Sequence, residues 1–243
     1  MKNLGKYFIF LGSMFRNMET FRTYVRNTVD EMVRIGLDSI FIVSIISTFI
    51  GAVTTVQTAY NLISPWIQDY IVATVVRDMT IQELAPSIIA LVFAGKVGSN
   101  IAGGLGTMRI TEQIDALEVM GINSTSYLVL PKIIAAMITF PMLVIMAGFL
   151  SIYGGYLTAL LTGVVSGPDY LYGIKAEFNP FMVTFALVKA VTFAFLIASV
   201  SSFRGFYTRG GALEVGQSST RAVTSSCIAI LAADYLLSQL LLA

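Results

Sequence analysis

Among the charged residues that lie inside mostly apolar stretches, three have the side chains best placed to do chemistry. Glu83, which follows Gln82, lies in the second such stretch, Lys189 in the fourth and Asp234 in the last. A charge at the bilayer centre costs at least about 2.5–3.5 kcal/mol, so such residues usually face a protein interior or a wet cavity. Glu83 and Lys189 therefore predict the polar wall of a cavity. The alternative is that each side chain merely extends to the membrane surface, and Asp234 also fits a simple boundary charge.

The residues required for most enzymatic chemistry are missing from the sequence. There is no His, and Cys227 is the one Cys, so we expect no zinc-type metal site. The sequence has neither the G-x-x-x-x-G-K-[ST] phosphate loop nor the G-x-S-x-G nucleophile motif. The net charge of +1 implies no nucleic-acid partner. We expect no catalytic residues, and any energy source must be another chain or an ion gradient.

The composition predicts an all-α integral membrane protein. Hydrophobic residues make up 56% of the chain and charged residues 12%, against about 25% charged residues in soluble domains. A span needs about 20 apolar residues, and five stretches are long enough: 37–62, 70–106, 133–161, 180–203 and 222–243. Residues 162–179 and 204–221 are predicted to be loops. We find no internal repeat.

The second stretch is longer than a bilayer is thick. As one straight α-helix, Tyr70 to Gly106 would measure about 55 Å. This stretch must tilt, break near Pro86 or project outward.

Residues 1–36 form a separate N-terminal region, ahead of a transmembrane domain of residues 37–243. Apolar residues recur there at helical spacing: Leu4, Tyr7, Phe8, Leu11, Phe15 and Met18. With basic neighbours, this stripe predicts an amphipathic helix in the membrane interface. The alternative is a helix packed on a partner protein.

Lysine and arginine predict the orientation. With the N-terminus in the cytoplasm, Arg77 and Lys175 are external, whereas Lys96 and Lys189 lie within helices. The remaining eleven are cytoplasmic: Lys2, Lys6, Arg16, Arg22, Arg26, Arg34, Arg109, Lys132, Arg204, Arg209 and Arg221. Five crossings then place the C-terminus outside. Helix geometry puts Lys189 about 22 Å above the cytoplasmic end of its span and Glu83 about 35 Å above Gly106, so a direct ion pair is not predicted.

Small residues at four-residue spacing line the later half of the second stretch: Ala94, Gly98, Ala102 and Gly106. In lipid, small residues at this spacing allow helix backbones to approach closely. The stripe predicts a helix-packing surface, and the alternative is a loop.

Residues 109–122 form a short amphipathic segment outside the bilayer. Ile110, Ile114, Leu117 and Gly121 share one helical face, whereas Glu112, Asp115 and Glu118 lie on another. A helix of this kind between two spans either transmits force from a soluble partner or simply connects the spans in solvent.

The central part of the sequence resembles a known family. Glu83-Leu84-Ala85-Pro86 through Phe93-Ala94-Gly95-Lys96-Val97-Gly98-Ser99 is similar to the segment "ELGPxxxALxxAGRxGS". Gly104-Leu105-Gly106-Thr107-Met108 through Thr111-Glu112-Gln113-Ile114-Asp115-Ala116-Leu117-Glu118-Val119-Met120-Gly121 is similar to "ELGxMxxxEQxDALxxMG". Together the two segments cover about forty residues, and they resemble the MlaE (YrbE) permease family, the membrane subunit of MCE-associated ABC lipid transporters. The sequence departs from the family pattern at Gln82, Ala85, Lys96 and Gly104, and Gln82 lacks the positive charge that the family often has there.

This resemblance implies a bacterial inner-membrane homodimer with two cytoplasmic ATPases, an external MCE-domain ring and a STAS-domain accessory protein. It implies glycerophospholipid movement between inner and outer membranes, which maintains outer-membrane lipid asymmetry. By position, it places Gln82, Glu83 and Lys189 near the lipid cavity and Leu62 and Trp66 along its acyl-chain part. The implied ATPase-coupling residues are Glu112, Gln113, Asp115, Leu117, Glu118 and Met120.

Two other function classes fit the residues. One is an ion-coupled secondary transporter of an amphipathic substrate, which would use Glu83, Lys189 and Asp234. Many such transporters contain inverted repeats, which we do not find here. The other is a scaffold that anchors an external ring without transporting anything.

Overall fold

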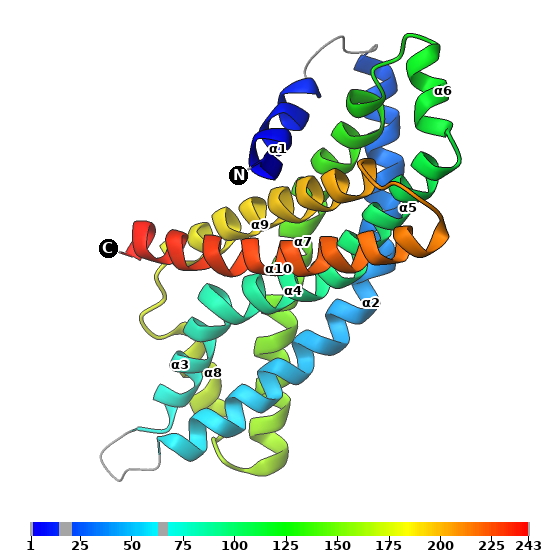
Figure 1. Cartoon of the computed structure of the whole chain (residues 1–243). Coiled ribbons are helices and arrows are strands. Elements are labelled where there is room, and N and C mark those ends of the chain that lie inside the picture. Colours follow the sequence, from blue (N-terminus) through cyan, green and yellow to red (C-terminus); the bar gives the residue numbers. More distant parts are fainter. Residues whose placement is uncertain (1, 15–20, 63–67, 243) are drawn as a thin grey trace. The chain divides into compact units, whose positions relative to one another are not determined.

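The computed structural model of the chain describes residues 2–14, 21–62 and 68–242, and this part of the chain is helical, with no strand (Figure 1). In chain order, the helices are α1 (Lys2–Ser13), α2 (Phe21–Asn61), α3 (Tyr70–Met79), α4 (Ile89–Phe93), α5 (Ser99–Ile110), α6 (Gln113–Val119), α7 (Ser124–Thr162), α8 (Gly167–Lys175), α9 (Phe181–Phe206) and α10 (Ala212–Leu242). Two π-helical segments, η1 (Thr80–Ile88) and η2 (Ala94–Gly98), join α3, α4 and α5 into one unbroken run.

Within the described ranges, five stretches are long and apolar enough to cross a membrane: Phe21–Asn61, Tyr70–Ile110, Ser124–Thr162, Phe181–Phe206 and Ala212–Leu241. The predicted all-helical protein with five apolar spans is confirmed, while the orientation of its termini stays a prediction. The first span extends further toward the N-terminus than expected. Helix α2 begins at Phe21 and continues unbroken past residue 36, so only α1 forms a separate helix in the N-terminal region.

The helices belong to two compact units. Unit 1 comprises Met1–Ser39, Ala90–Phe140 and Val191–Ala243, and unit 2 comprises Ile40–Ile89 and Pro141–Ala190. Helices α2, α7 and α9 each contribute residues to both units, as does the run from α3 to α5. The two units are therefore built from different parts of the same helices, and each has its own internal contacts.

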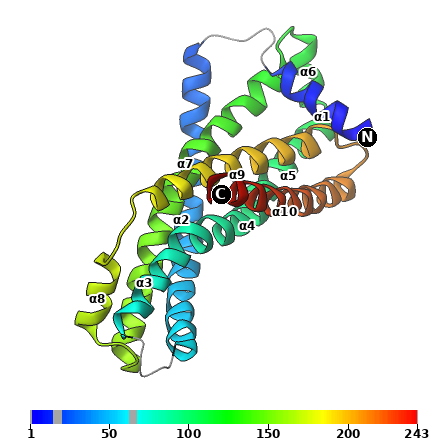
Figure 2. The ribbon, with the colours of Figure 1, turned by 90° about the vertical axis from the view of Figure 1, so that its left-hand side faces the viewer.

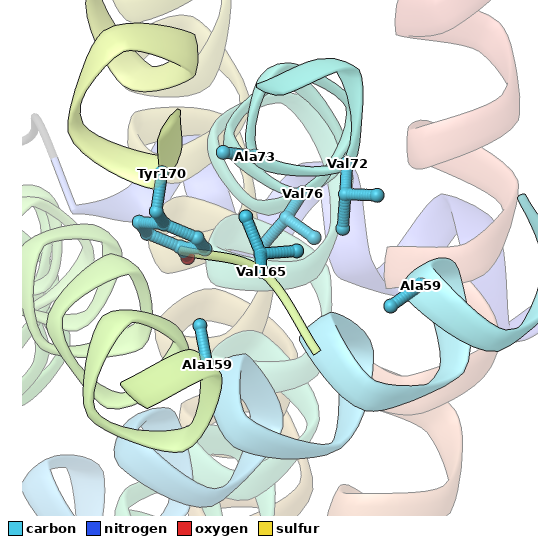
Figure 3. Packing of buried hydrophobic residues seen from close by; sticks show 7 residues of the cluster. All are labelled: Ala59, Val72, Ala73, Val76, Ala159, Val165 and Tyr170. Carbon is cyan, nitrogen blue, oxygen red and sulfur yellow. The ribbon is translucent and has the colours of Figure 1, made fainter. Parts of the chain in front are cut away.

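A hydrophobic cluster in unit 2 joins α2, α3, α7 and α8. Its buried members are Ala59, Val72, Ala73, Val76, Ala159, Val165 and Tyr170. Figure 3 shows the ring of Tyr170 directed toward Val76 and Val165. Burial raises the pKa of the Tyr170 hydroxyl, and a hydrogen bond with Thr55 opposes that shift. The hydroxyl is therefore neutral at physiological pH and donates to the carbonyl oxygen of Ile152 at 3.3 Å.

Helices α2 and α7 of unit 2 approach each other at glycines. A Cβ atom at Gly51 would lie 1.7 Å from the carbonyl oxygen of Ser151, and one at Gly154 would lie 2.4 Å from the carbonyl oxygen of Thr48. The Ser151 hydroxyl donates to the carbonyl oxygen of Ser47 at 2.7 Å. Because lipid provides no hydrophobic force between helices, close packing and such hydrogen bonds must hold them together.

In unit 1, α5 and α10 run side by side (Figures 1 and 2). The predicted small-residue stripe is buried at all four positions: Ala94, Gly98, Ala102 and Gly106. A Cβ atom at Gly98 would lie 2.8 Å from the Ser201 hydroxyl, and one at Gly106 would lie 3.2 Å from a methyl group of Val215. The helix-packing role of the stripe stays a prediction, which these close approaches support.

Two predicted loops are partly helical. Residues 162–179 contain α8, and residues 204–221 contain the end of α9 and the start of α10, so these loop predictions were wrong. Gly167, Pro168 and Asp169, within the first predicted loop, begin helix α8. Ser166 is the N-cap of α8, and its hydroxyl accepts from the backbone N–H of Asp169 at 3.2 Å, with Pro168 in the first turn. Proline is tolerated in the first turn because a backbone N–H at its position would have no helical partner.

We predict that Gly51→Ala lowers the stability of the protein by about 1–3 kcal/mol, because the added methyl group overlaps the backbone of α7. The measurement is the thermal unfolding midpoint in detergent. The matched control is Gly148→Ala in α7, where an added Cβ meets nothing within 4 Å. Equal midpoints for the two variants would contradict the close α2–α7 contact.

Candidate functional site

Glu83 and Lys189 form an ion pair in unit 2. The Nζ atom of Lys189, on α9, lies 2.6 Å from Oε1 of Glu83, on η1. The Lys189 side chain has no exposed surface, whereas that of Glu83 is 45% exposed. The Lys189 Nζ atom also lies 4.5 Å from the centroid of the Phe185 ring, within the range of a cation–π interaction. A fully buried cation is thus held by a carboxylate that remains accessible.

The ion pair was not expected, because the predicted heights of the two side chains differed. That estimate treated residues 70–106 as a straight α-helix. The run instead contains the π-helical segments η1 and η2. Their i→i+5 hydrogen bonds widen the turn, so a rise of 1.5 Å per residue does not apply. Glu83 lies within η1, and its position could not be derived from α-helical geometry.

Pro86 accounts for a further contact of Lys189. Proline has no N–H and clashes with the carbonyl four residues earlier, which here belongs to Gln82. The widened turns of η1 accommodate Pro86 within the helix, and the Lys189 Nζ atom donates to the Gln82 carbonyl oxygen at 3.3 Å. The run from α3 to α5 therefore does not break at Pro86, which was one of the three possibilities for this stretch. Pro86 has no N–H to donate to the Gln82 carbonyl, and the side chain of Lys189 from another helix binds that carbonyl.

An apolar cavity lies on the same elements as the ion pair. Its volume is about 140 Å³, and η1, α7 and α9 line it. The lining residues are Ile81, Ala85, Val144, Ile145, Gly148, Phe149, Val183, Ala186 and Leu187. Ile81 and Ala85 flank Glu83 in the chain, and Leu187 precedes Lys189 by two residues. Unit 2 thus contains an apolar cavity and a pair of charges on the same helices, although neither Glu83 nor Lys189 lines the cavity.

A wider apolar groove runs along α2 of the same unit. It has a volume of about 550 Å³, and its wall includes Val53, Val56, Gln57 and Tyr60. Tyr60 is 78% exposed and Val53 is 61% exposed, so large apolar side chains on this face of α2 remain exposed. Because this surface is exposed and apolar, it can contact acyl chains or another helix.

Leu62 lines neither the apolar cavity nor the apolar groove. Leu62 is half-buried and packs against the hydrophobic cluster of Figure 3. Trp66 lies outside the described residues. The acyl-chain role predicted for these two residues stays a prediction.

Arg77, which was expected to be an ordinary external charge, is 1% exposed. Its guanidinium donates to the carbonyl oxygens of Ile174 at 2.8 Å and Ala176 at 2.6 Å, at the C-terminal end of α8. It also pairs with Asp78 at 2.7 Å. Carbonyls at a helix C-terminus lack helical partners and carry partial negative charge, so Arg77 fixes α8 against α3. The sequence did contain a signal for this role, because Arg77 stands one residue before Asp78 inside an apolar stretch.

Helix α6, in unit 1, has a residue with positive φ on each side of it. Glu112 precedes it in the left-handed conformation, with φ of 59°, and Gly121 follows it with φ of 80°. The N–H of Ile122 donates to the carbonyl of Leu117, and that of Gly121 donates to the carbonyl of Glu118. This is the Schellman arrangement, in which a glycine takes the conformation that other residues avoid. Both ends of the helix are therefore well defined.

Side-chain contacts hold α6 to its neighbours. Arg109 pairs with Asp115 at 2.7 Å, and the Ser124 hydroxyl donates to the Glu118 carboxylate at 2.8 Å. Ile114 has no exposed surface. Of the predicted coupling residues, Asp115 and Glu118 are thus engaged within the chain, although Glu118 remains exposed.

The opposite side of α6 is exposed and ends in two apolar residues. Glu112 and Gln113 are exposed, and Leu117 is half-buried. Val119 is 89% exposed and Met120 is 66% exposed. Val119 was not among the predicted coupling residues, although it lies next to Met120 in the sequence. A firmly held helix with an exposed apolar end is suited to contact a partner.

In the part of the chain that the structure describes, no group of three or more His, Cys, Asp or Glu side chains is arranged to hold a metal ion. Cys227 is a half-buried thiol.

Comparison with known proteins identifies relatives along most of the chain. The family described as Permease MlaE matches residues 28–240. A probable ABC transporter permease protein of Rickettsia bellii is 36% identical over 98% of this chain and 92% of its own length. One of Synechocystis is 33% identical over 96% of this chain and 89% of its own length. Protein TRIGALACTOSYLDIACYLGLYCEROL 1, chloroplastic, of Arabidopsis thaliana is 32% identical over 88% of this chain and 61% of its own length.

We predict that Glu83→Gln destabilises the protein more than Lys189→Met does. Glu83→Gln leaves a cation without exposed surface, whereas Lys189→Met leaves a carboxylate that water can reach. Orphaning a buried charge costs about 3–5 kcal/mol, and we expect at least about 2 kcal/mol for Glu83→Gln. Thermal unfolding of both variants and of the double variant measures this. A double variant whose loss of stability equals the sum of the two single losses would show that the pair is not coupled.

Proposed function

The chain belongs to the MlaE permease family, and we propose that it moves glycerophospholipids between the inner and outer membranes as part of an ATP-driven transporter. Its relatives are named as ABC transporter permeases, and the chain itself is a transporter permease subunit with five apolar spans. The proposal consists of three parts: the substrate is a glycerophospholipid, the energy comes from ATP, and the transport is between the inner and outer membranes.

One observation carries the lipid assignment: η1 and α9 of unit 2 carry an ion pair and also line an apolar cavity. A glycerophospholipid has apolar chains and a charged headgroup, so its binding site needs a mostly apolar wall and a few polar groups. Unit 2 provides the cavity and groove for the chains. The half-exposed carboxylate of Glu83 provides a polar contact for the headgroup. The name of the Arabidopsis relative includes a lipid, trigalactosyldiacylglycerol, which supports a substrate of the broader glycerolipid class.

The proposed energy source is a separate ATPase that contacts α6. Helix α6 is fixed at both ends and presents Val119 and Met120 to solvent. A rigid helix transmits a push from a partner better than a flexible loop does. The positive-inside distribution supports a cytoplasmic N-terminus, a cytoplasmic α6 and an external C-terminus in a bacterial inner membrane. The further proposed partners are a second copy of the chain, an external MCE-domain protein and a STAS-domain accessory protein.

We predict that phospholipid stimulates ATP hydrolysis by the reconstituted permease–ATPase complex, and that Lys189→Met lowers the stimulation at least about tenfold. The expected loss follows because Glu83 then lacks the cation that positions it. The matched control is Lys175→Met, which removes an exposed lysine of α8. Hydrolysis that is indifferent to lipid would contradict the proposal. Lipid transport that stops when the proton gradient is dissipated, with ATP present, would favour the ion-coupled alternative.

We predict that Val119→Asp separates the ATPase from the permease during co-purification, because the charge replaces an apolar contact on α6. The control is Leu171→Asp on α8, an apolar residue that is 47% exposed and lies on the predicted external side. If both variants retain the ATPase, or both lose it, α6 is not its specific docking site.

A further inference from the structure

A polar pocket lies in unit 1 and is built from residues that the proposed transport site does not use. It has a volume of about 410 Å³, within the range of small-ligand sites. Helix α1 contributes Lys6, the end of α9 and the following loop contribute Arg204 and Arg209, and α10 contributes Arg221. Four segments of the chain thus direct basic side chains to one pocket.

The pocket carries an excess of positive charge. Four cations line it, and Glu214 is its one acidic lining residue. The Glu214 carboxylate accepts from the N–H of Gly211 at 2.9 Å, at the start of α10, in the manner of a capping box. Among the described residues, none of the four cations has a salt-bridge partner.

Two of the arginines are held in place by neutral groups. Arg204 donates to the Ser225 hydroxyl at 3.0 Å, and Arg221 donates to the side-chain oxygen of Gln217 at 3.4 Å. These contacts orient the guanidinium groups without neutralising them. Because a guanidinium has five N–H donors, each arginine keeps donors for an anion.

The loop between α9 and α10 is also fixed. The Thr208 hydroxyl donates to the Ser218 hydroxyl at 2.9 Å, and the Ser218 hydroxyl donates to the carbonyl oxygen of Arg204 at 2.8 Å. This chain of hydrogen bonds ties the loop that carries Arg209 to both helices. The pocket is therefore formed before any ligand arrives.

Helix α1 closes one side of the pocket. Tyr7 hydrogen-bonds with Ser199 at 2.7 Å, and Phe10, which is 1% exposed, packs its ring against Phe203 and Phe206. This docked face holds Lys6 beside the arginines. Figure 1 shows α1 next to the end of α9 that leads into α10.

The other face of α1 indicates where the anion comes from. Phe8 is 68% exposed and Ile9 is 73% exposed, so α1 presents large apolar side chains next to the basic Lys6. A helix with this pattern lies in the membrane interface, with its apolar face in the lipid. The pocket is then at the level of the headgroups, where basic pockets between spanning helices bind anionic lipids.

We propose that this pocket binds the phosphate of an anionic membrane lipid and thereby anchors α1 in the interface. The site is independent of the proposed transport function, since it uses other residues and its test measures binding alone. Arg204, Arg209 and Arg221 supply fixed charge and planar donors that suit a phosphate.

The test is native mass spectrometry of the full chain in detergent, titrated with phosphatidylglycerol or with phosphatidylcholine of the same acyl chains. We expect the wild type to bind phosphatidylglycerol at least about tenfold more tightly. We expect the triple variant Arg204→Gln, Arg209→Gln and Arg221→Gln to lose that preference. The effect of one arginine should be about fivefold. The matched control, Arg22→Gln with Arg26→Gln and Arg34→Gln, removes equal charge from α2 and should keep the preference.

Three outcomes would overturn the proposal. The first is a preference that survives in the triple variant or disappears equally in the control. The second is displacement of phosphatidylglycerol by millimolar inorganic phosphate, which would assign the pocket to free phosphate. The third is loss of ATPase co-purification with unchanged lipid binding, which would assign the basic surface to a protein partner. If the glutamine variant does not fold, the corresponding triple Arg→Lys variant retains the charge and must retain the preference.

Discussion

The ammonium group of Lys189 has no exposed surface, and this constraint organises unit 2. A buried cation requires an opposite charge and hydrogen-bond acceptors. Glu83 supplies the charge at 2.6 Å, and the carbonyl of Gln82 supplies an acceptor at 3.3 Å. That carbonyl lies four residues before Pro86, so the proline and its surrounding π-helical turns create part of the site for the lysine. A local backbone irregularity and an intramembrane charge are thus two parts of one arrangement.

The same unit shows how polar and small residues replace hydrophobic force in lipid. Gly51 permits α2 to approach α7 so closely that no side chain fits between them. Arg77 binds carbonyls at the end of α8. A Cβ atom at Gly173 would lie 2.2 Å from the carbonyl oxygen of Tyr70, so α3 and α8 also meet backbone to backbone. These contacts fix α3, which continues without a break into η1, the segment that carries Glu83.

The sequence predicts the spans well, because a bilayer requires apolar stretches of about 20 residues and such stretches are plain in the sequence. It also predicts a helix at α6, because the apolar and acidic residues separate onto two faces, although α6 is shorter than the predicted 109–122 and Gly121 follows it. It fails where structure depends on contacts between distant residues. The Glu83–Lys189 pair required knowing that residues 80–88 are π-helical, and no periodicity indicates that. Arg77 was interpreted from its charge alone, although its role comes from carbonyls about a hundred residues away. In contrast, α8 had a local signal, since Ser166 and Asp169 around Pro168 form a recognisable helix start.

The most direct test of the account is capture of lipid beside the ion pair. A photoreactive amino acid is placed at Gln82 in the permease–ATPase complex, and the complex is washed extensively in detergent to remove bulk lipid before illumination. The control position is Phe41, which is 75% exposed on α2. The account predicts that phospholipid is cross-linked at position 82 and scarcely at position 41. No cross-linked lipid at position 82, or equal capture at both positions, would contradict it.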